Sequence, residues 1–196
     1  MRRHKWILIG LIILLGAVLY SNLGQGTLAL WGKGEQKEAA AESSQSLTEL
    51  LAAQAPKPGT PSPSFSLEDL DGQVYTVGGK RDKALLLNFW ASWCDPCKEE
   101  ASDLVALAKK YSDSIDVYAV NVTLYDQLDN VKKFVQDYGY TFPVLLDKKE
   151  EVYRKFNGVA FPTNVLIGKD GVIQEVIVGS LSAKDLEAKM KKLTNS

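Results

Sequence analysis

Residues 84–97 read Ala-Leu-Leu-Leu-Asn-Phe-Trp-Ala-Ser-Trp-Cys-Asp-Pro-Cys, an apolar run that leads into two cysteines, Cys94 and Cys97. The first half of this stretch is almost continuously apolar, which is typical of a strand covered on both faces. After Cys97, apolar residues such as Ala101 and Leu104 recur at helical spacing. The stretch therefore predicts a buried strand that passes into a helix, with the cysteine pair at the junction.

The sequence on either side of this stretch alternates between strand-like and helix-like patterns. Upstream, residues 65–77 read as a hairpin around the favoured turn dipeptide Asp71-Gly72. Downstream we expect strands at 115–122, 142–146, 163–167 and 172–178, and helices after the N-cap Asp126, at 148–156 and after the N-cap Ser182. Strands that alternate with helices pair in parallel, and the late hairpin adds an antiparallel edge. The predicted fold of residues 65–196 is an α/β sandwich with a mixed central sheet.

Residues 1–31 have a different character. Basic residues, Arg2, Arg3 and Lys5, precede an uncharged, mostly apolar run that continues to Gly32. Such a run is long enough to span a bilayer as a helix, and the cations before it place the N-terminus in the cytoplasm. We predict a cytoplasmic stub and a transmembrane signal-anchor here, with a cleaved signal peptide as the alternative. In either case the rest of the chain is exported.

Residues 32–64 join this segment to the predicted domain. They are rich in Ala, Ser, Glu, Gln and Lys, and prolines punctuate their last part, at positions 56, 58, 61 and 63. Such a composition cannot bury enough apolar surface to offset the entropy of ordering. We therefore expect a flexible tether, with residues 65–196 as the folded domain.

The composition narrows the possible chemistry. Lys and Arg total 23 against 24 Asp and Glu, so the strongly basic balance of nucleic-acid-binding proteins is absent. The chain has two Cys and a single His, His4, at its N-terminus. This excludes hydrolysis that depends on histidine, and a zinc site built from four cysteines. No nicotinamide- or flavin-binding motif occurs, so we expect neither cofactor nor metal, and redox chemistry falls to Cys94 and Cys97.

The position of the cysteine pair favours such chemistry. Backbone N–H groups at a helix N-terminus stabilise negative charge, so we expect a lowered pKa for the Cys94 thiol. Cys97 lies one turn further on and can close a disulfide, and Pro96 fits a first helical turn because no N–H bond is lost there. A structural disulfide across so short a loop would add little stability. Half of an intermolecular zinc site is a further alternative, whereas haem attachment needs a His where Lys98 stands.

The motif Phe89-Trp90-Ala91-Ser92-Trp93-Cys94-x-Pro-Cys97, with Phe161-Pro162-Thr163 further on, resembles the thioredoxin superfamily. The predicted anchor, hairpin and additional segment 111–146 are most similar to its TlpA/ResA-like branch of exported thiol-disulfide oxidoreductases. The resemblance implies a thioredoxin-like α/β/α sandwich. It does not extend to thiol peroxidases, because the Pro and Thr that precede their reactive cysteine do not precede Cys94.

The resemblance also implies roles for individual residues. Cys94 would be the exposed nucleophile that attacks a substrate disulfide, and Cys97 the partly buried resolving thiol. Pro162 would be a cis-proline facing the pair, with Phe161 offering its backbone to an extended substrate segment. The expected substrate-binding surface is completed by Trp93, Asp95 and Pro96.

Two carboxylates near the pair carry further expectations. Asn88 stands where ordinary thioredoxins have a buried Asp, and Asn cannot accept the Cys97 proton. Glu100, on the same side of the helix as Cys97, is the expected base, as in ResA-like proteins; alternatively it only complements the helix dipole. Asp95 opposes thiolate formation and so favours a reducing couple. The acid that many ResA-like proteins carry after the second strand is replaced here by Thr123-Leu124-Tyr125.

Together these features predict a membrane-tethered, extracytoplasmic thiol-disulfide oxidoreductase that reduces disulfides in exported proteins. The resemblance implies apocytochrome c as the leading client, because haem attachment needs free thiols, and spore-envelope proteins as a second. It also implies a membrane thiol carrier as electron donor, and we expect a monomeric domain. The alternatives are a disulfide-forming oxidase and a dithiol metal-binding or chaperone module.

Overall fold

The computed structural model describes residues 56–195 of the chain. The predicted membrane anchor (residues 1–31) and most of the predicted linker (residues 32–64) lie outside the described residues. Within residues 56–195, no helix combines the length and the apolar character needed to cross a bilayer. Residues 56–195 form the predicted C-terminal domain together with a short segment that precedes it.

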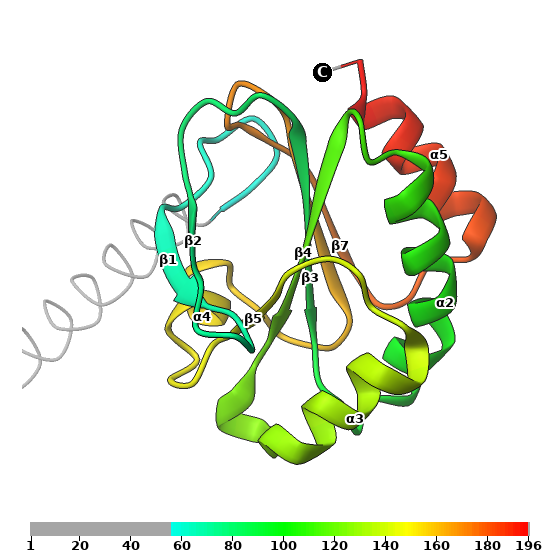
Figure 1. Ribbon diagram of the computed structural model, residues 1–196. Coiled ribbons are helices and arrows are strands. Elements are labelled where there is room, and N and C mark those ends of the chain that lie inside the picture. Colours follow the sequence, from blue (N-terminus) through cyan, green and yellow to red (C-terminus); the bar gives the residue numbers. More distant parts are fainter. Residues whose placement is uncertain (1–55, 196) are drawn as a thin grey trace, which may run out of the picture. The chain divides into compact units, whose positions relative to one another are not determined.

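A five-stranded sheet forms the centre of the domain (Figure 1). Its strands are β3 (Ala84–Trp90), β4 (Ile115–Asn121), β5 (Val144–Leu146), β6 (Thr163–Ile167) and β7 (Ile173–Val178), in the order β5-β4-β3-β6-β7. β4 pairs in parallel with β3 and β5, whereas β6 runs antiparallel to β3 and β7. The predicted mixed sheet is confirmed: helices connect the parallel strands, and a tight turn joins the last two.

Helices cover one face of this sheet, and a hairpin with a short helix covers the other (Figure 1). The first face carries α2 (Asp95–Lys110), α3 (Leu128–Tyr138) and α5 (Ala183–Leu193), and the second carries α4 (Glu151–Lys155). Because successive side chains of a strand point to opposite faces, β3 supplies both layers and is buried along its whole length. The predicted strand with two covered faces is therefore confirmed.

The predicted N-terminal hairpin is also confirmed. β1 (Phe65–Glu68) pairs antiparallel with β2 (Val74–Val77). Asp69 Oδ1 accepts from the backbone N–H of Asp71 and of Gln73, both at 2.9 Å, so this side chain closes the turn. Phe65 and Val77 point into the core beside Phe89 of β3, which attaches the hairpin to the sheet.

The folded part begins earlier than the expected boundary at residue 65. The backbone N–H of Gly59 donates to Ile173 O at 2.8 Å, and that of Ser62 donates to Gly171 O at 2.9 Å. Pro61 lies opposite Val172 in an isolated antiparallel bridge. The prolines do not prevent this pairing, because an edge segment needs only alternate N–H groups. The end of the predicted tether is thus held against the sheet.

Of the two predicted helix caps, one is confirmed and the other is wrong. Ser182 caps α5 as predicted, since its Oγ accepts from Asp185 N at 3.2 Å. The prediction that Asp126 caps the next helix is wrong, because α3 begins after Gln127 and no side chain caps it. The Asp126 carboxylate instead binds donors in the loop that precedes Cys94.

The topology brings the predicted functional residues to one edge of the sheet. β3, β4 and β5 all end at this edge, and the antiparallel strand β6 begins there. The cysteines follow β3, residues 122–127 follow β4, and Phe161-Pro162 precede β6. Segments far apart in the sequence therefore meet at the N-terminus of α2.

Candidate active site

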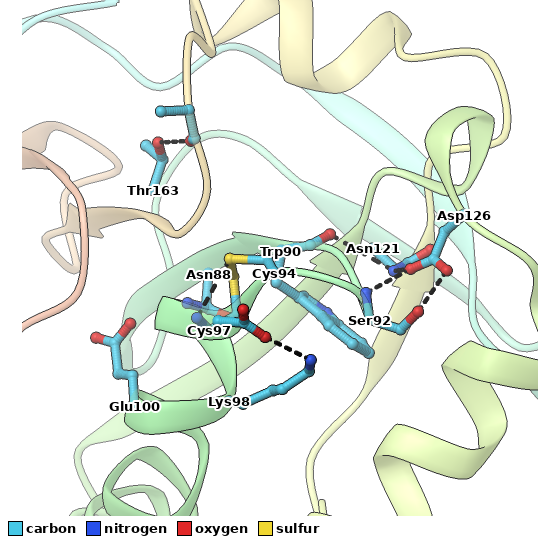
Figure 2. Close-up of a disulfide and its surroundings, with 12 residues drawn as sticks. Asn88, Trp90, Ser92, Cys94, Cys97, Lys98, Glu100, Asn121, Asp126 and Thr163 are labelled. Carbon is cyan, nitrogen blue, oxygen red and sulfur yellow. Dashed lines mark hydrogen bonds and ion pairs between the residues drawn. A yellow bond between two sulfur atoms is a disulfide. The ribbon is translucent and has the colours of Figure 1, made fainter.

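Cys94 and Cys97 form a disulfide at the start of α2, with a Cα–Cα distance of 5.3 Å (Figure 2). Cys94 is the N-cap of this helix, and its Sγ accepts from Cys97 N at 3.2 Å. Pro96 lies in the first turn, as predicted. A backbone N–H directed at Sγ favours a thiolate at Cys94 once the disulfide is reduced. The expected placement of the pair at a strand-to-helix junction is confirmed.

Neither cysteine is freely exposed. Cys94 and Cys97 are each 4% exposed, so in the disulfide form the expectation of an exposed Cys94 is wrong. The reason is tertiary packing, because the pair lies within an apolar cluster with Trp90 and Ala101. The two cysteines nevertheless differ: Cys94 lines a surface groove of about 930 Å³, and Cys97 does not. A substrate in the groove therefore reaches Cys94 first.

Aromatic and small residues form most of this groove. Its lining residues are Trp93, Cys94, Asp95, Pro96, Tyr125, Glu150, Tyr153, Gly158, Val159, Ala160 and Phe161. Both of its carboxylates are paired with cations: Asp95 with Lys98 at 2.6 Å, and Glu150 with Arg154 at 2.7 Å. The groove thus presents an apolar surface with no unpaired charge among its lining residues.

Trp93 and Phe161 form facing parts of the groove. The Trp93 indole is 57% exposed, and its ring meets that of Phe161 edge-on, with centroids 5.8 Å apart. The indole Nε1 donates to Tyr125 O at 2.8 Å, which fixes the ring against the segment after β4. Of the predicted substrate-binding residues, Trp93, Asp95, Pro96 and Phe161 all line the groove.

Pro162 lies behind Phe161 and is buried, and the Phe161–Pro162 peptide bond is cis. The preceding loop is held by two hydroxyl groups: Thr163 Oγ1 and Tyr153 Oη donate to Ala160 O, at 2.7 and 3.0 Å. Pro162 O accepts from Gly179 N at 2.8 Å. The loop that faces the cysteines is therefore anchored on both sides of the proline.

Glu100 lies on α2 one turn after Cys97 and is only 2% exposed. Its Oε1 accepts from Asn164 Nδ2 at 2.8 Å, and Asn164 Oδ1 accepts from Asn88 Nδ2 at 2.9 Å. Asn88 and Asn164 are directly opposite each other on β3 and β6. Asn88, which stands where ordinary thioredoxins have a buried Asp, is thus linked to Glu100 through the amide side chain of Asn164.

Burial raises the pKa of Glu100 to about 7. The hydrogen bond from Asn164 and the nearby backbone of Leu181 oppose this shift, and Asp103 adds to it. Oε2 has no hydrogen-bond partner of good geometry, and no cation pairs with Glu100 among residues 56–195. The alternative that Glu100 only complements the helix dipole on a solvated surface does not fit these surroundings. A carboxyl group with this pKa can both take and return a proton near neutral pH.

The site contains one residue that sequence reasoning placed elsewhere. Asp126 accepts hydrogen bonds from Ser92 and Asn121, which follow or end two neighbouring strands (Figure 2). An acidic residue shortly after a parallel strand was visible in the sequence. The sequence does not show that Ser92 is the partner of Asp126, because this contact depends on how β3 and β4 are aligned.

The fold and the site define a thioredoxin-like protein with a redox-active cysteine pair. Residues 58–176 match the model of the AhpC/TSA family. "Thioredoxin-like protein YneN" of Bacillus subtilis is 38% identical over 133 residues, covering 67% of this chain and 78% of the relative. "Thiol-disulfide oxidoreductase ResA" of Geobacillus kaustophilus is 33% identical over 138 residues, covering 69% and 77%. The crystal structure of StoA from Bacillus subtilis matches with a TM-score of 0.58 and 27% identity, covering 66% of this chain and 97% of StoA.

The chain therefore belongs to the AhpC/TSA family of thioredoxin-like proteins, and it is a thiol-disulfide oxidoreductase of the ResA type. The resemblance expected from the cysteine motif and the Phe-Pro-Thr segment is confirmed. Cys94 and Cys97 are the pair that this activity requires, since the described residues contain no other cysteine.

Proposed function

We propose that this oxidoreductase works in the reducing direction, on disulfides of exported proteins. The observation that carries the direction is the buried carboxylate of Glu100, which lies on the helix of the cysteine pair and pairs with no cation in the described part of the chain. Negative charge close to the pair disfavours the thiolates and so stabilises the disulfide relative to the dithiol. A couple of this kind has a low reduction potential and passes its electrons to substrate disulfides.

The proposed reaction uses the geometry of the groove. The Cys94 thiolate attacks a substrate disulfide, which releases one substrate thiolate and forms a mixed disulfide. Glu100 then takes the proton of the Cys97 thiol, and the Cys97 thiolate attacks Cys94 Sγ. The second substrate thiolate leaves, so the substrate gains two electrons and, with two protons, becomes a dithiol. The enzyme is left as the disulfide described above.

The enzyme must then be reduced again. Because the chain has no nicotinamide or flavin motif, we infer that electrons arrive by dithiol exchange from a membrane thiol carrier. This supports a position at the outer face of the cell membrane, with residues 1–31 as a single-pass anchor and the N-terminus in the cytoplasm. The proposed domain is a monomer, since one chain supplies both cysteines and the groove.

Apocytochrome c is the proposed leading client, because its Cys-x-x-Cys-His segment must be reduced before haem is attached. Spore-envelope proteins are the second proposal. The segment after β4 distinguishes this chain from many ResA-like proteins, because Leu124 and Tyr125 are about half exposed where an acid is expected. An apolar surface at this position supports contacts with apolar residues of the client near its cysteines.

The first experiment is the reduction potential of the Cys94/Cys97 couple. The full-length chain in detergent is equilibrated with thiol buffers, and the reduced fraction is read by the mass added by a thiol reagent. A value near or below about −270 mV, that of thioredoxin, supports a reductase. A value nearer about −120 mV supports the disulfide-forming oxidase, and the cytochrome proposal then falls.

The location is tested separately in intact cells. After reduction, a maleimide that cannot cross membranes should modify Cys94 without cell lysis, with the Cys94→Ser variant as the control. Labelling that needs lysis would contradict the extracytoplasmic position. For the client, the Cys97→Ser variant is mixed with oxidised peptides that carry Cys-x-x-Cys-His or Cys-x-x-Cys-Ala. Equal trapping of both peptides would remove the sequence basis for a cytochrome client.

A further inference from the structure

Asp126 accepts four hydrogen bonds beside the active site. Its Oδ2 accepts from Ser92 N at 2.6 Å and from Asn121 Nδ2 at 2.9 Å. Its Oδ1 accepts from Ser92 Oγ at 2.6 Å and from Gln127 N at 2.8 Å. Hydrogen bonds to an ionised carboxylate are shorter and stronger than neutral ones. Three of these four bonds come from Ser92, in the loop after β3, and from Asn121, the last residue of β4, and not from the helix that follows Asp126.

Asn121 shows that this arrangement is specific. It is fully buried, and its amide nitrogen is directed at Asp126 while its Oδ1 has no partner among the described residues. An unpartnered buried oxygen is costly. The orientation is nevertheless set by Asp126 and the Trp90 carbonyl, because both are acceptors and a rotated amide would place its oxygen against them.

The segment of Tyr125 and Asp126, after β4, is joined to the active site at a second point. The Trp93 indole donates to Tyr125 O, the residue directly before Asp126. Ser92 is thus bound to Asp126 and Trp93 to Tyr125, and Cys94 follows these two residues immediately. Trp93 and Tyr125 are parts of the groove wall, so this wall and the nucleophile are connected through a few short bonds.

We propose that Asp126 is a positioning residue that fixes the wall formed by Trp93 and Tyr125 relative to Cys94 Sγ. Its function is to present an extended protein segment to the nucleophile. The reactivity of Cys94 itself has a different origin, because Sγ is held by the N–H of Cys97 within α2. Loss of Asp126 should therefore weaken the use of protein disulfides far more than the use of small ones. The proposal rests on thiol-disulfide exchange alone and not on the client or the direction.

The test compares two disulfides with the reduced full-length chain in detergent. One is glutathione disulfide, and the other is an extended ten-residue peptide with a Cys-x-x-Cys disulfide. In Asp126→Ala we expect the second-order rate constant for reduction of the peptide in a single turnover to fall by about ten-fold or more, mainly through a higher half-saturating peptide concentration, because small displacements of a bound substrate have large effects. For glutathione disulfide we expect a change below about three-fold, and an unchanged pH profile of Cys94 alkylation.

Two further variants keep the test decisive. Asp129→Ala removes an exposed carboxylate from the first turn of α3 and should change neither rate. Ser92→Ala removes one donor to Asp126 and should give a smaller loss with the same selectivity for the peptide, even if Asp126→Ala does not fold. An equal loss with both disulfides, or no loss with the peptide, would overturn the proposal. An oxidising potential would overturn the proposed direction but not this comparison, since exchange can be followed from either side.

Discussion

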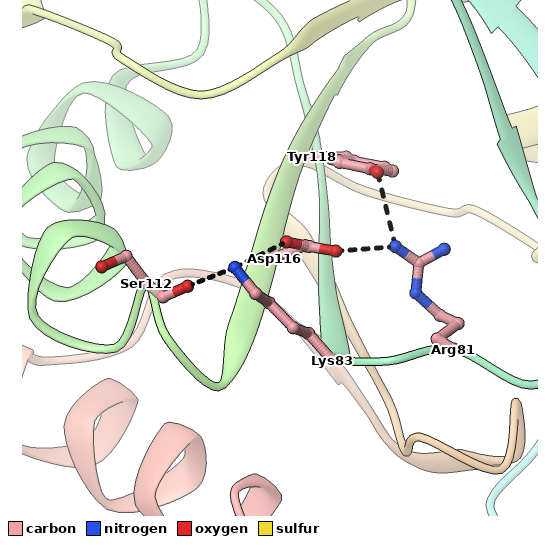
Figure 3. Close-up of polar contacts among 5 residues, drawn as sticks. All are labelled: Arg81, Lys83, Ser112, Asp116 and Tyr118. Carbon is pink, nitrogen blue, oxygen red and sulfur yellow. Dashed lines mark hydrogen bonds and ion pairs between the residues drawn. The ribbon is translucent and has the colours of Figure 1, made fainter.

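The two ends of the central sheet hold their carboxylates in opposite ways. At the end where β3 and β4 finish, Glu100 is buried, has one amide partner and, within residues 56–195, no paired cation. At the other end, Asp116 lies between Arg81, at 3.0 Å, and Lys83, at 4.0 Å (Figure 3). Arg81 also reaches Tyr118 Oη at 3.4 Å and lies over the Tyr118 ring, and Lys83 donates to Ser112 O at 2.7 Å.

The difference shows which end of the domain is built for stability and which for chemistry. Arg81 and Lys83 both pair with Asp116, and the pairing links the segment before β3 to the start of β4. The unpaired Glu100 is destabilised when charged, so it can exchange a proton near neutral pH. A group of this kind costs folding stability, and Glu100 lies one turn after Cys97 on α2, which supports its proposed role as a base.

The largest expected effect is that of the cysteines themselves. Cys94→Ser should abolish turnover, because the attacking sulfur is lost. Cys97→Ser should accumulate a mixed disulfide between Cys94 and the substrate, since no thiol remains to resolve it. Mass spectrometry of the protein after mixing with an oxidised peptide distinguishes the two. Normal turnover in either variant would falsify the proposed mechanism.

Glu100→Gln should separate stability from activity. The folded-state pKa of about 7 lies above the ordinary 4.5, so the folded protein binds the extra proton between these values. Stability is therefore full below about pH 4.5 and falls as the pH rises through about 7. The variant removes this loss and should be more stable than the unmodified protein at pH 8, by at most roughly 3 kcal/mol, and by a much smaller amount at pH 5.

Urea unfolding at the two pH values measures this effect, and the exposed neighbour Glu99→Gln is the matched control. In kinetics, Glu100→Gln should slow the resolution of the mixed disulfide and flatten its rise with pH near 7. A stability change that is the same at pH 5 and pH 8, together with an unchanged pH profile, would return Glu100 to a purely structural role.

Asp116→Asn probes the opposite end of the sheet. Removing the charge leaves the largely buried Arg81 without its carboxylate, and we expect a loss of about 1–2 kcal/mol in the free energy of unfolding. The reduction potential and the turnover should not change. A shift of the potential would mean that the two ends of the sheet are coupled, which would contradict the division described above.

The smallest expected effect is at Asp95. The sequence predicts that this carboxylate makes the couple more reducing, but Lys98 pairs with it at 2.6 Å and the pair is solvated. Asp95→Asn should therefore raise the potential by less than about 30 mV. Lys98→Gln, which leaves the Asp95 charge unpaired, should lower it by a similar amount. A rise well above this limit in Asp95→Asn would mean that the charge acts on Cys94 despite its partner.

The order of strands and helices was predictable because its signals are local. The alternation of apolar runs, the Asp71-Gly72 turn and the Ser182 cap each act within a few residues, and each predicted element is present. The junction of a buried strand with a helix placed Cys94 at an N-cap for the same reason. The differences concern contacts between segments far apart in the sequence: Asp126 was assigned to the helix beside it, Cys94 was expected to be exposed, and residues 59–62 were assigned to a tether.

The sequence by itself determined the chemistry of this protein: two cysteines one helical turn apart, an Asn in place of a buried Asp, and a Glu one helical turn after the second cysteine. Only the tertiary structure decided how these groups behave. The raised pKa of Glu100, the shielding of Cys94 in a groove and the attachment of Ser92 to Asp126 all need segments that β3, β4 and β6 bring to one edge. Burial and long-range hydrogen bonds arise from chain topology, and local patterns of sequence do not contain them.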